Sequence, residues 1–291
     1  MNKISIITLT YKNWHLLDKA IASVASQIIN EKYEVEYLIV DDGTPDFNIE
    51  YVTGLLASTH LNYRVIVNPE NMGTVASFNN AIQQSTGDII VPLSADDEFY
   101  DTTVVNDIAE EFNRTGAYII TGLRVPVVGG KESPPLPKLK DLVLFSDKTA
   151  LLKQLLVHQN IISGASTYYQ KNIFHKVGYF DESYRLLEDY PFYIRALTLG
   201  IEVALFKRKT IKYGMDGISS SGQINPILRN DFNLLHSKAA ISEELSNSER
   251  KLVVYTKLMN KNKKLLYILK YPKQFMYVLF KKIKIALFND D

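Results

Sequence analysis

The chain has 291 residues, of which 46% are hydrophobic and 22% are charged, with a formal net charge of +1 and no cysteine. This composition supports a sizeable core and excludes a disordered chain, a disulfide framework and any cysteine-based metal site or nucleophile. The N-terminal apolar run is too short for a signal peptide, and no apolar segment approaches the roughly 18 residues of a membrane span, so we expect a protein that stays inside the cell.

The first hundred residues alternate short apolar runs with amphipathic segments. This alternation predicts an α/β fold with a Rossmann-like, mostly parallel sheet that has helices on both faces. No G-x-G-x-x-G motif follows the first strand and no P-loop motif occurs, so the usual dinucleotide and P-loop folds are not supported. The predicted strands are 4–9, 37–40, 63–67 and 88–93, and the predicted helices are 17–24, 47–58 and 74–84.

Acidic residues directly follow two of these strands. Asp41 and Asp42 end the second strand, and Asp96, Asp97 and Glu98 follow the fourth. The carboxyl ends of parallel strands form the edge at which ligands bind in such sheets. Clustered carboxylates repel one another unless a cation joins them, and a hard divalent cation prefers oxygen ligands. The sequence therefore predicts either a metal site at this edge or an acidic turn that caps the next helix.

The second half of the chain carries fewer signals. We expect a helix around residues 105–112, one or two strands within Tyr118–Val128, a helix over Lys148–His158 and a strand or turn over 161–169. The loop 129–137 is rich in glycine and proline, and it either covers a site or is a plain surface connection.

A further pair of acids precedes a predicted helix. Pro191 suits a first helical turn, where its missing N–H costs nothing, and this places Glu188 and Asp189 at or next to the N-cap. The positive end of the helix would keep such a carboxylate ionised, as a general base requires. A purely structural cap is the alternative for this pair.

In chain order, these motifs resemble those of the family 2 glycosyltransferases, which are inverting enzymes of the GT-A fold that use nucleotide-activated sugars. The resemblance covers about residues 3–222. Each motif falls where a loop is predicted at the same edge of the sheet. The motifs are Thr10-Tyr11-Lys12-Asn13, Asp41-Asp42-Gly43-Thr44, Asn71-Met72-Gly73 with Asn79, Ser94-Ala95-Asp96-Asp97, Gly178-Tyr179-Phe180-Asp181-Glu182 and Glu188-Asp189.

The resemblance implies how a nucleotide-sugar donor is held. Thr10 and Tyr11 border the nucleobase and ribose, and Asp42 accepts a hydrogen bond from the base. Asp96 and Asp97 hold Mn²⁺ or Mg²⁺, which offsets charge on the departing nucleoside diphosphate. The implied donor-binding residues are Thr10, Tyr11, Asp42, Asn71, Gly73, Asn79 and Asp96.

The resemblance also implies the catalytic pair. Asp189 matches the family's base, with Glu188 beside it, and takes the proton of the acceptor hydroxyl that attacks the anomeric carbon. The chain departs from the family pattern in three places. Ser94 stands where an acid usually begins the metal motif, Phe78 stands where an Arg is frequent, and no His lies within 212–219.

The function implied by the resemblance is metal-dependent, inverting glycosyl transfer. A hexosyl or N-acetylhexosaminyl group would move from a UDP-sugar to a hydroxyl of a glycan or lipid-linked acceptor, as in bacterial polysaccharide biosynthesis. Two alternatives remain, a non-catalytic module that binds nucleotide sugars or glycans, and a sugar nucleotidyltransferase. The segment Thr10-Tyr11-Lys12-Asn13 lacks the glycine- and Arg/Lys-rich signature of nucleotidyltransferases. No nucleic-acid partner is expected.

The last part of the chain differs from the rest in charge. Residues 249–291 carry eleven basic and three acidic side chains, a net charge of +8, which leaves −7 on residues 1–248. Such a difference indicates a separate interaction region. The expected domains are a GT-A catalytic domain at 1–222, with a nucleotide-binding half at 1–100 and an acceptor half at 101–222, and a C-terminal helical region at 223–291.

The tail after Pro272 has the pattern of a basic amphipathic helix. Such a helix lies on anionic membranes, because each basic residue near the surface contributes about 1 kcal/mol. We therefore expect a cytoplasmic enzyme held peripherally at the inner face of the cell membrane through 249–291. The alternative is that the apolar stripe packs on the catalytic domain or on a second subunit of a homodimer. The apolar stripe comprises Phe275, Met276, Leu279, Phe280, Ile283 and Leu287, and Lys273, Gln274, Tyr277, Lys281 and Lys284 lie mainly opposite.

Overall fold

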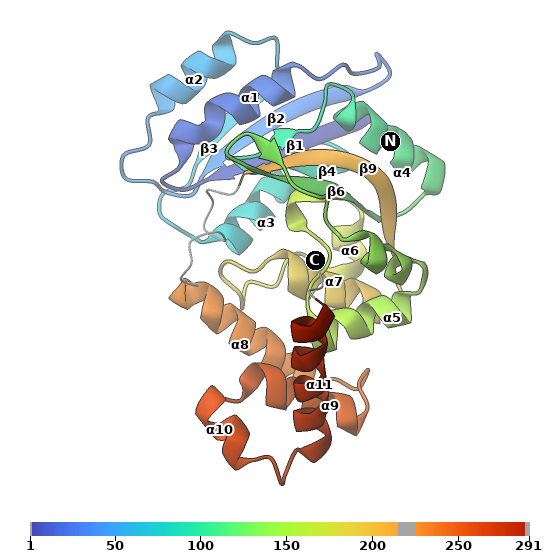
Figure 1. Ribbon diagram of the computed structural model, residues 1–291. Coiled ribbons are helices and arrows are strands. Elements are labelled where there is room, and N and C mark those ends of the chain that lie inside the picture. The colour runs from blue at the N-terminus through green and yellow to red at the C-terminus, as the bar shows by residue number, and fades with distance from the viewer. Residues whose placement is uncertain (1, 215–224, 289–291) are drawn as a thin grey trace.

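A nine-stranded sheet runs through the molecule, and helices cover both of its faces (Figure 1). The computed structural model describes residues 2–214 and 225–288, without the side chains of 261–262, 265 and 284–288. The strands are β1 (Lys3–Thr10), β2 (Glu34–Asp41), β3 (Tyr63–Val67), β4 (Ile89–Pro92), β5 (Glu98–Phe99), β6 (Ile119–Val128), β7 (Lys131–Glu132), β8 (Thr167–Gln170) and β9 (Val203–Gly214).

The order of the strands is β3-β2-β1-β4-β8-β6-β9-β5, and β7 pairs with β6 outside this path. The first four strands of this order are parallel, and β6 is parallel to β9. β8 is antiparallel to both β4 and β6, and β5 is antiparallel to β9. The predicted α/β fold is confirmed, and its continuous parallel part comes from the first hundred residues. The antiparallel pairs of the second half were not indicated by the sequence.

The helices match the predicted ones closely in the first half of the chain. Helix α3, for example, has the predicted bounds. The α-helices are α1 (Leu17–Ala25), α2 (Ile49–Ala57), α3 (Thr74–Gln84), α4 (Val104–Thr115), α5 (Lys148–Lys153), α6 (Ile173–Val177), α7 (Asp189–Thr198), α8 (Pro226–Ala240), α9 (Asn247–Val253), α10 (Lys261–Leu266) and α11 (Pro272–Phe288). Short 3-10 helices lie at Trp14–Leu16, Leu139–Ser146 and Gly164–Ser166, and π turns lie at Gln154–His158 and Val254–Leu258.

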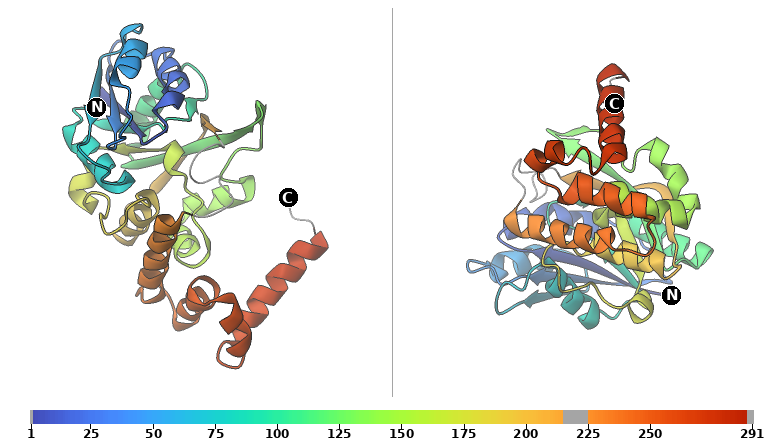
Figure 2. Two further views of the ribbon diagram at one scale, coloured as in Figure 1. Left: turned by 90° about the vertical axis from the view of Figure 1, so that its left-hand side faces the viewer. Right: turned by 90° about the horizontal axis from the view of Figure 1, so that it is seen from below.

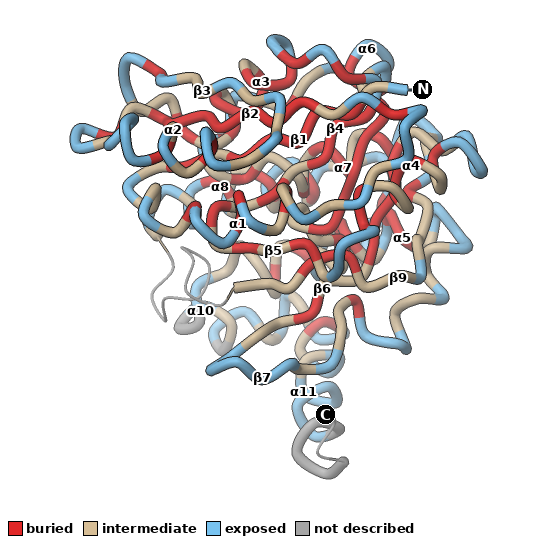
Figure 3. The backbone as a smooth tube through the Cα atoms, turned by 90° about the horizontal axis from the view of Figure 1, so that it is seen from above, coloured by how far each residue is buried: buried red, intermediate tan, exposed pale blue. Residues whose placement is uncertain are grey.

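Each face of the sheet has its own hydrophobic core. Along β1, Ile4 and Ile6 pack on the side of α1, α2 and α4, whereas Ile7 packs on the side of α3, α5, α6 and α7. All three side chains are at most 1% exposed. Figure 3 shows the buried strands inside a rim of exposed loops. Burial on both faces explains why these strands are continuous apolar runs and not alternating ones.

Residues 118–137 form one long strand and a loop that returns to it. Tyr118–Val128 contains one long strand, β6, and not two. The loop 129–137 turns back on this strand, because β7 pairs with β6 and the backbones of Leu136 and Arg124 exchange two hydrogen bonds. None of the residues 129–137 lines the cavity described below. The loop is therefore a surface connection in this structure.

The C-terminal helices extend below the sheet and then away from it (Figure 2). Helix α8 buries Leu235 and Ala239, and the segment after it buries Val253 and Tyr255. Helix α11 packs on this segment at its start, where Gln274 is buried. Tyr277 of α11 also stacks on His158, with ring centres 6.3 Å apart, and the remainder of α11 projects from the body of the molecule (Figure 2).

Four residues of the apolar stripe predicted on α11 are exposed. Met276, Leu279, Phe280 and Ile283 have exposed fractions between 37% and 62%. These four side chains do not pack on the catalytic domain in this structure, whereas Phe275 is half-buried. The side chains of Leu287 and Lys284 lie outside the described ones. Among the described residues, no helix has the length and apolar character that crossing a membrane requires.

The turn into β4 supplies a test of the fold. Gly87 donates its N–H to Ser5 Oγ, and a Cβ at this position would lie 2.5 Å from Ser5 N and 2.8 Å from Ile4 C. We expect Gly87→Ala to lower the free energy of unfolding by about 1–3 kcal/mol, because β1 and β4 must separate. Gly54→Ala is the control, since nothing lies within 4 Å of that Cβ and the residue is helical. Urea unfolding should show Gly54→Ala stabilised by about 0.5–1 kcal/mol. Equal stability of both variants would contradict the close packing.

Candidate active site

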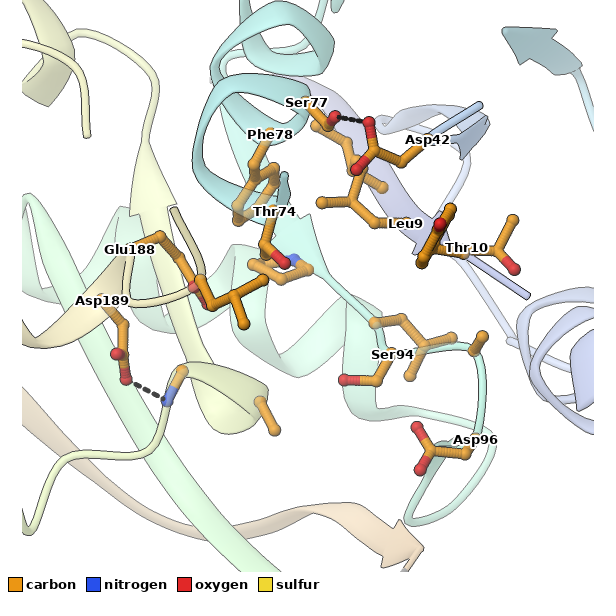
Figure 4. Close-up of a pocket in the computed structure, with 18 of the residues that line it drawn as sticks. Leu9, Thr10, Asp42, Thr74, Ser77, Phe78, Ser94, Asp96, Glu188 and Asp189 are labelled. Carbon is orange, nitrogen blue, oxygen red and sulfur yellow. Dashed lines mark hydrogen bonds between the residues drawn. The ribbon is translucent and has the colours of Figure 1, made fainter. Parts of the chain in front are cut away.

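A cavity of about 330 Å³ lies at the carboxyl ends of β1 and β4 and reaches the first residues of α7 (Figure 4). Ser94 and Asp96 lie on one side of it, and Glu188 and Asp189 lie on the other. The predicted site residues that line this cavity are Thr10, Tyr11, Asp42, Asp96, Glu188 and Asp189. The predicted site residues that do not line it are Asn71, Gly73, Asn79 and Asp97.

The turn after β1 is shaped by Asn13, which belongs to the first sequence motif but was given no role there. The Thr10 hydroxyl and the Tyr11 N–H both donate to Asn13 Oδ1, at 2.8 and 3.0 Å. This turn places Lys12 at a φ of 62°, with its Nζ 5.1 Å from the centre of the Tyr11 ring. The N–H of Lys12 donates to Thr44 Oγ1, which ties this turn to the one after β2. Tyr11 is thus held at the cavity wall.

Asp42 organises the loop that follows β3. Its carboxylate accepts the N–H groups of Met72 and Gly73, at 2.8 and 2.9 Å, and the Ser77 hydroxyl at 2.6 Å (Figure 4). Asn68 Nδ2 donates to the same carboxylate at 3.2 Å. Asp42 is 5% exposed, so most of its hydrogen-bonding capacity is used inside the protein. The main observed effect of this carboxylate is to fix the loop.

Gly73 and Asn71 belong to this loop and contribute to its shape. Gly73 has a φ of +87°, which favours glycine, and a Cβ there would lie 2.6 Å from Arg185 Cγ. Asn71 accepts hydrogen bonds from Arg185 at both its backbone and side-chain oxygens. Neither residue lines the cavity, and their direct contact with a donor stays a prediction.

Asn79 is used in the interior and not at the cavity. It is 2% exposed, donates to Phe180 O and Glu182 Oε1, and accepts the Phe180 N–H. These bonds satisfy its amide and pin the segment before α7 to α3. The side chain thus faces Phe180 and not the cavity, and a donor-binding role for Asn79 stays a prediction.

The two acids after β4 have different surroundings. Asp96 lines the cavity beside Ser94. Asp97 is 1% exposed and accepts the Gly214 N–H at 2.8 Å. Burial raises the pKa of Asp97 to about 7, and the nearby charge of Asp96 adds to this rise. Asp96 is therefore the carboxylate at the cavity wall and Asp97 lies behind it, and metal binding by the two acids stays a prediction.

Helix α7 begins with the predicted catalytic pair. Glu188 is its N-cap, Asp189 its first residue, and Pro191 lies in its first turn as predicted. Asp189 accepts the Gly164 N–H at 3.1 Å and the Tyr190 N–H at 2.6 Å. A Cβ on Gly164 would lie 3.1 Å from Asp189 Oδ2, so glycine permits this close approach.

Burial and the helix N-terminus have opposite effects on the pKa values of Glu188 and Asp189. Burial raises the pKa of Asp189, while the two N–H donors and the charge of Arg124 oppose the rise. Burial, and then the charge of Asp189, raise the pKa of Glu188. The expectation that the helix end alone keeps the pair ionised is therefore incomplete. The hydrogen bonds favour the ionised form of Asp189, whose charge favours a proton on Glu188.

Arg124 is an important residue that sequence reasoning missed. It lies in β6 where the register with β9 is irregular, and its guanidinium is 4.5 Å from the centre of the Tyr213 ring. Its positive charge opposes the rise in pKa of both Asp97 and Asp189. A single Arg inside an apolar strand gives no signal of such a position. The irregular register beside Arg124 changes the direction of its side chain relative to a regular strand.

Aromatic packing holds α7 in place behind the pair. Phe180 and Phe192 have ring centres 5.0 Å apart, and Phe192 lies 5.7 Å from Tyr169 of β8. The Tyr169 hydroxyl shares a hydrogen bond with Tyr193 at 3.1 Å. The predicted motif 178–182 thus acts as a structural support of α7.

Comparison with known proteins shows the family to which the chain is related. The family model described as Glycosyl transferase family 2 matches residues 5–178. The chain is 26% identical over 194 residues to the uncharacterized glycosyltransferase YwdF of Bacillus subtilis, covering 67% of this chain and 68% of that one. It is 28% identical over 128 residues to glycosyltransferase AglE of Haloferax volcanii, covering 44% of this chain and 38% of that one.

Solved structures of S. aureus TarS have a similar fold. TarS matches with a TM-score of 0.61 and 18% identity, covering 88% of this chain and 43% of the TarS chain. The present chain therefore spans less than half of that protein. The structure of TarS 1-349 in complex with UDP-GlcNAc matches with a TM-score of 0.62 and 18% identity, covering 88% of this chain and 71% of that one.

The buried Asp97 carboxyl predicts a pH-dependent stability. Its folded pKa lies above the unfolded value of about 3.9, so the folded chain binds a proton that the unfolded chain lacks. This contribution is lost as the pH rises from about 4 to 7. We expect Asp97→Asn to gain roughly 1–3 kcal/mol relative to the parent over this window, with a plateau above it. Urea unfolding in a buffer that contains chelator measures the difference in free energy of unfolding. Asp88→Asn is the control, because Asp88 is exposed and immediately precedes β4. A difference that does not change with pH would contradict the buried acid.

Proposed function

The chain belongs to glycosyl transferase family 2 and is a glycosyltransferase, and we propose that it transfers a sugar from a UDP-sugar to an acceptor hydroxyl with inversion. The observation that carries this proposal is the single cavity in which Asp96 faces Glu188 and Asp189. A UDP donor is supported by the complexes of TarS 1-349 with UDP and UDP-GlcNAc. The transferred group in the proposal is a hexosyl or N-acetylhexosaminyl group.

The donor would occupy the side of the cavity formed by β1, β2 and β4. Tyr11 offers its ring to the base, with Thr10 beside the ribose. Asp42, which lines the same cavity, would accept a hydrogen bond from a base N–H. Asn71 and Gly73 support this site through the loop that Asp42 holds.

The cavity fits a metal ion shared between protein and diphosphate. Among the described residues, no group of three or more acidic, His or Cys side chains could hold a metal alone. Mg²⁺ usually takes one or two carboxylates together with substrate phosphates. Asp96 would hold Mg²⁺ or Mn²⁺ in this way, with Asp97 behind it. The ion would stabilise the negative charge that develops on the departing diphosphate.

Asp189 is the proposed general base. It would accept the proton of the acceptor hydroxyl as that oxygen bonds to the anomeric carbon. The bond from this carbon to the diphosphate oxygen breaks on the opposite face, and its electron pair leaves with UDP. The N–H donors from Gly164 and Tyr190 aim the carboxylate and favour its ionised form. Glu188, with a raised pKa, is the neighbour that holds a proton beside it.

The domain arrangement and the location are part of the proposal. Residues 1–222 would be the GT-A catalytic domain, with a donor half at 1–100 and an acceptor half at 101–222. The helical region 223–291 would hold this cytoplasmic enzyme on the inner face of the cell membrane, near a glycan or lipid-linked acceptor. This is supported by the basic composition of 249–291 and by the exposed apolar face of α11. A homodimer through these helices is the alternative.

The two other function classes make different predictions about UDP. A non-catalytic binding module would bind UDP-sugars without releasing UDP. A sugar nucleotidyltransferase would release pyrophosphate from UTP and a sugar phosphate. Release of UDP from UDP-sugars with Mn²⁺, and its loss with chelator, therefore tests the proposal against both.

Variants of the cavity test the roles of the acids. We expect Asp96→Asn to lower metal-dependent UDP release at least tenfold, because it removes the carboxylate offered to the ion. Asp88→Asn, which removes an exposed carboxylate at the other end of β4, is the control and should keep full activity. Chelator-sensitive activity that is unchanged in Asp96→Asn would place the metal elsewhere.

The base makes a separate prediction. Asp189→Asn should keep UDP binding within about twofold and lose roughly 10²–10⁴-fold in transfer, because the nucleotide side is untouched. Activity of the parent should rise with pH, since deprotonation makes Asp189 a base and burial raises its pKa. Calorimetry with UDP and a UDP-release assay measure the two effects. Full activity of this variant would move the base to Glu188.

The tail is tested by co-sedimentation with vesicles. Val253 and Tyr255 are core residues, so point variants are cleaner than truncation. We expect the combined variant Phe280→Ser, Lys281→Glu and Lys282→Glu to bind anionic vesicles at least tenfold more weakly, since lost apolar area and reversed charge both oppose binding.

The matched control changes a second exposed apolar residue that has two lysines beside it. Leu139 is 85% exposed, and Lys138 and Lys140 flank it. The control Leu139→Ser, Lys138→Glu and Lys140→Glu should bind vesicles like the parent. Neutral vesicles and high salt should both abolish binding. Equal binding by the two triple variants, or sedimentation data showing a dimer that only the α11 variant disrupts, would favour the homodimer.

A further inference from the structure

The turn of residues 185–187, immediately before the catalytic pair, is fixed by a carboxylate of α8. Asp231 is 6% exposed and lies far along the chain from this turn. It accepts the N–H groups of Arg185 at 3.1 Å, Leu186 at 2.7 Å and Leu187 at 3.1 Å. Three successive backbone donors to one carboxylate define the path of the chain, and such charge-assisted bonds are strong.

The same turn is bonded to the loop held by Asp42. Arg185 Nη2 donates to the backbone oxygen of Asn71 at 2.8 Å and to its Oδ1 at 2.7 Å. The Val75 N–H donates to Arg185 O at 3.3 Å. A Cβ on Gly73 would lie 2.6 Å from Arg185 Cγ and 2.8 Å from Arg185 O, so the loop and the turn are in direct contact.

These contacts form one continuous path between the two sides of the cavity. Asp42, at the donor side, holds the N–H groups of Met72 and Gly73. The loop 71–73 contacts Arg185, and the turn 185–187 leads directly into Glu188 and Asp189. No step of the proposed reaction uses Arg185 or Asp231, yet Arg185 lies on this path and Asp231 fixes the turn with which it ends.

We propose that Arg185 and Asp231 are positioning residues that couple nucleotide binding beside Asp42 to the placement of Glu188 and Asp189. A nucleotide that orders the loop 71–73 would also order the turn 185–187 through Arg185. If donor binding orders both the loop 71–73 and the turn 185–187, the donor site and the catalytic pair are coupled in free energy. The inference rests on the proposed function in one respect, namely that a uridine nucleotide binds at the Asp42 side of the cavity.

Hydrogen–deuterium exchange of the full chain with UDP and Mg²⁺ tests this coupling. In the parent, we expect UDP to slow exchange at amides 71–75 and also at amides 185–190, each by about fivefold or more. In Arg185→Gln, UDP should still slow 71–75 but should change 185–190 by less than about twofold. Arg185 is exposed, so this variant is expected to fold.

Three further variants make the test specific. Arg185→Lys keeps one donor toward Asn71 and should restore part of the UDP effect at 185–190. Asp231→Asn weakens the hydrogen bonds from the N–H groups of 185–187. UDP should then no longer slow exchange at 185–190 but should still slow it at 71–75. Arg114→Gln is the control, because it removes an exposed Arg that makes two bonds to Glu111 on α4, and it should behave like the parent.

The outcomes separate this inference from the proposed function. If UDP slows no amide of 71–75 in the parent, the proposed donor site is wrong and the coupling is lost with it. If UDP slows 71–75 but not 185–190 in the parent, or slows both equally in Arg185→Gln, the donor site stands and the coupling is overturned. A merely structural role of Arg185 would change exchange without UDP and leave the UDP effect as in the parent.

Discussion

The short strand β8 is the constraint on which the rest of the site depends. It pairs antiparallel with β4 through Ile89 and Ile90 and with β6 through Ile119 and Thr121, and so joins the parallel half of the sheet to the mixed half. Its residue Tyr169 lines the cavity and bonds α7 through the Tyr193 hydroxyl. Because one strand makes all these contacts, the acidic turn after β4 and the start of α7 face each other across a single cavity.

Burial sets the electrostatics of this arrangement. Burial raises the pKa of the carboxyls of Asp97, Glu188 and Asp189, of which Asp97 is fully buried and the other two are half-buried at the cavity wall. The protein limits this cost with backbone N–H donors to Asp97 and Asp189 and with the charge of Arg124 near both. Two of these groups, Glu188 and Asp189, line the cavity, and acids with perturbed pKa values in a cavity are typical of catalytic sites. Buried carboxyls destabilise the folded state. The two hydrophobic cores, where the strands are buried on both faces, offset this destabilisation.

The sequence predicted the elements whose bounds depend on local patterns of residues. Helix α3 and strand β3 have the predicted bounds, since apolar periodicity and a flanking glycine or proline are local signals. It could not distinguish Asp96 from Asp97, because adjacent acids look alike until the turn decides which one faces the cavity. It also could not show that Asn79 bonds Phe180, since that contact joins residues 101 positions apart. Arg124 was missed because a side chain beside a β-bulge has no sequence pattern.

The charge of the cavity wall bears on how a donor could bind there. Among the described residues, the wall includes Asp42, Asp96, Glu188 and Asp189 and no Lys, Arg or His. A diphosphate adds further negative charge, and like charges a few ångströms apart cost several kcal/mol at the effective dielectric constant of a protein interior. A proton on Glu188 and the hydrogen bonds to Asp42 reduce this repulsion, but neither acts on the phosphates. A divalent cation at Asp96 would act on them directly, so the same acidic wall that repels a free nucleotide would bind a nucleotide–metal complex.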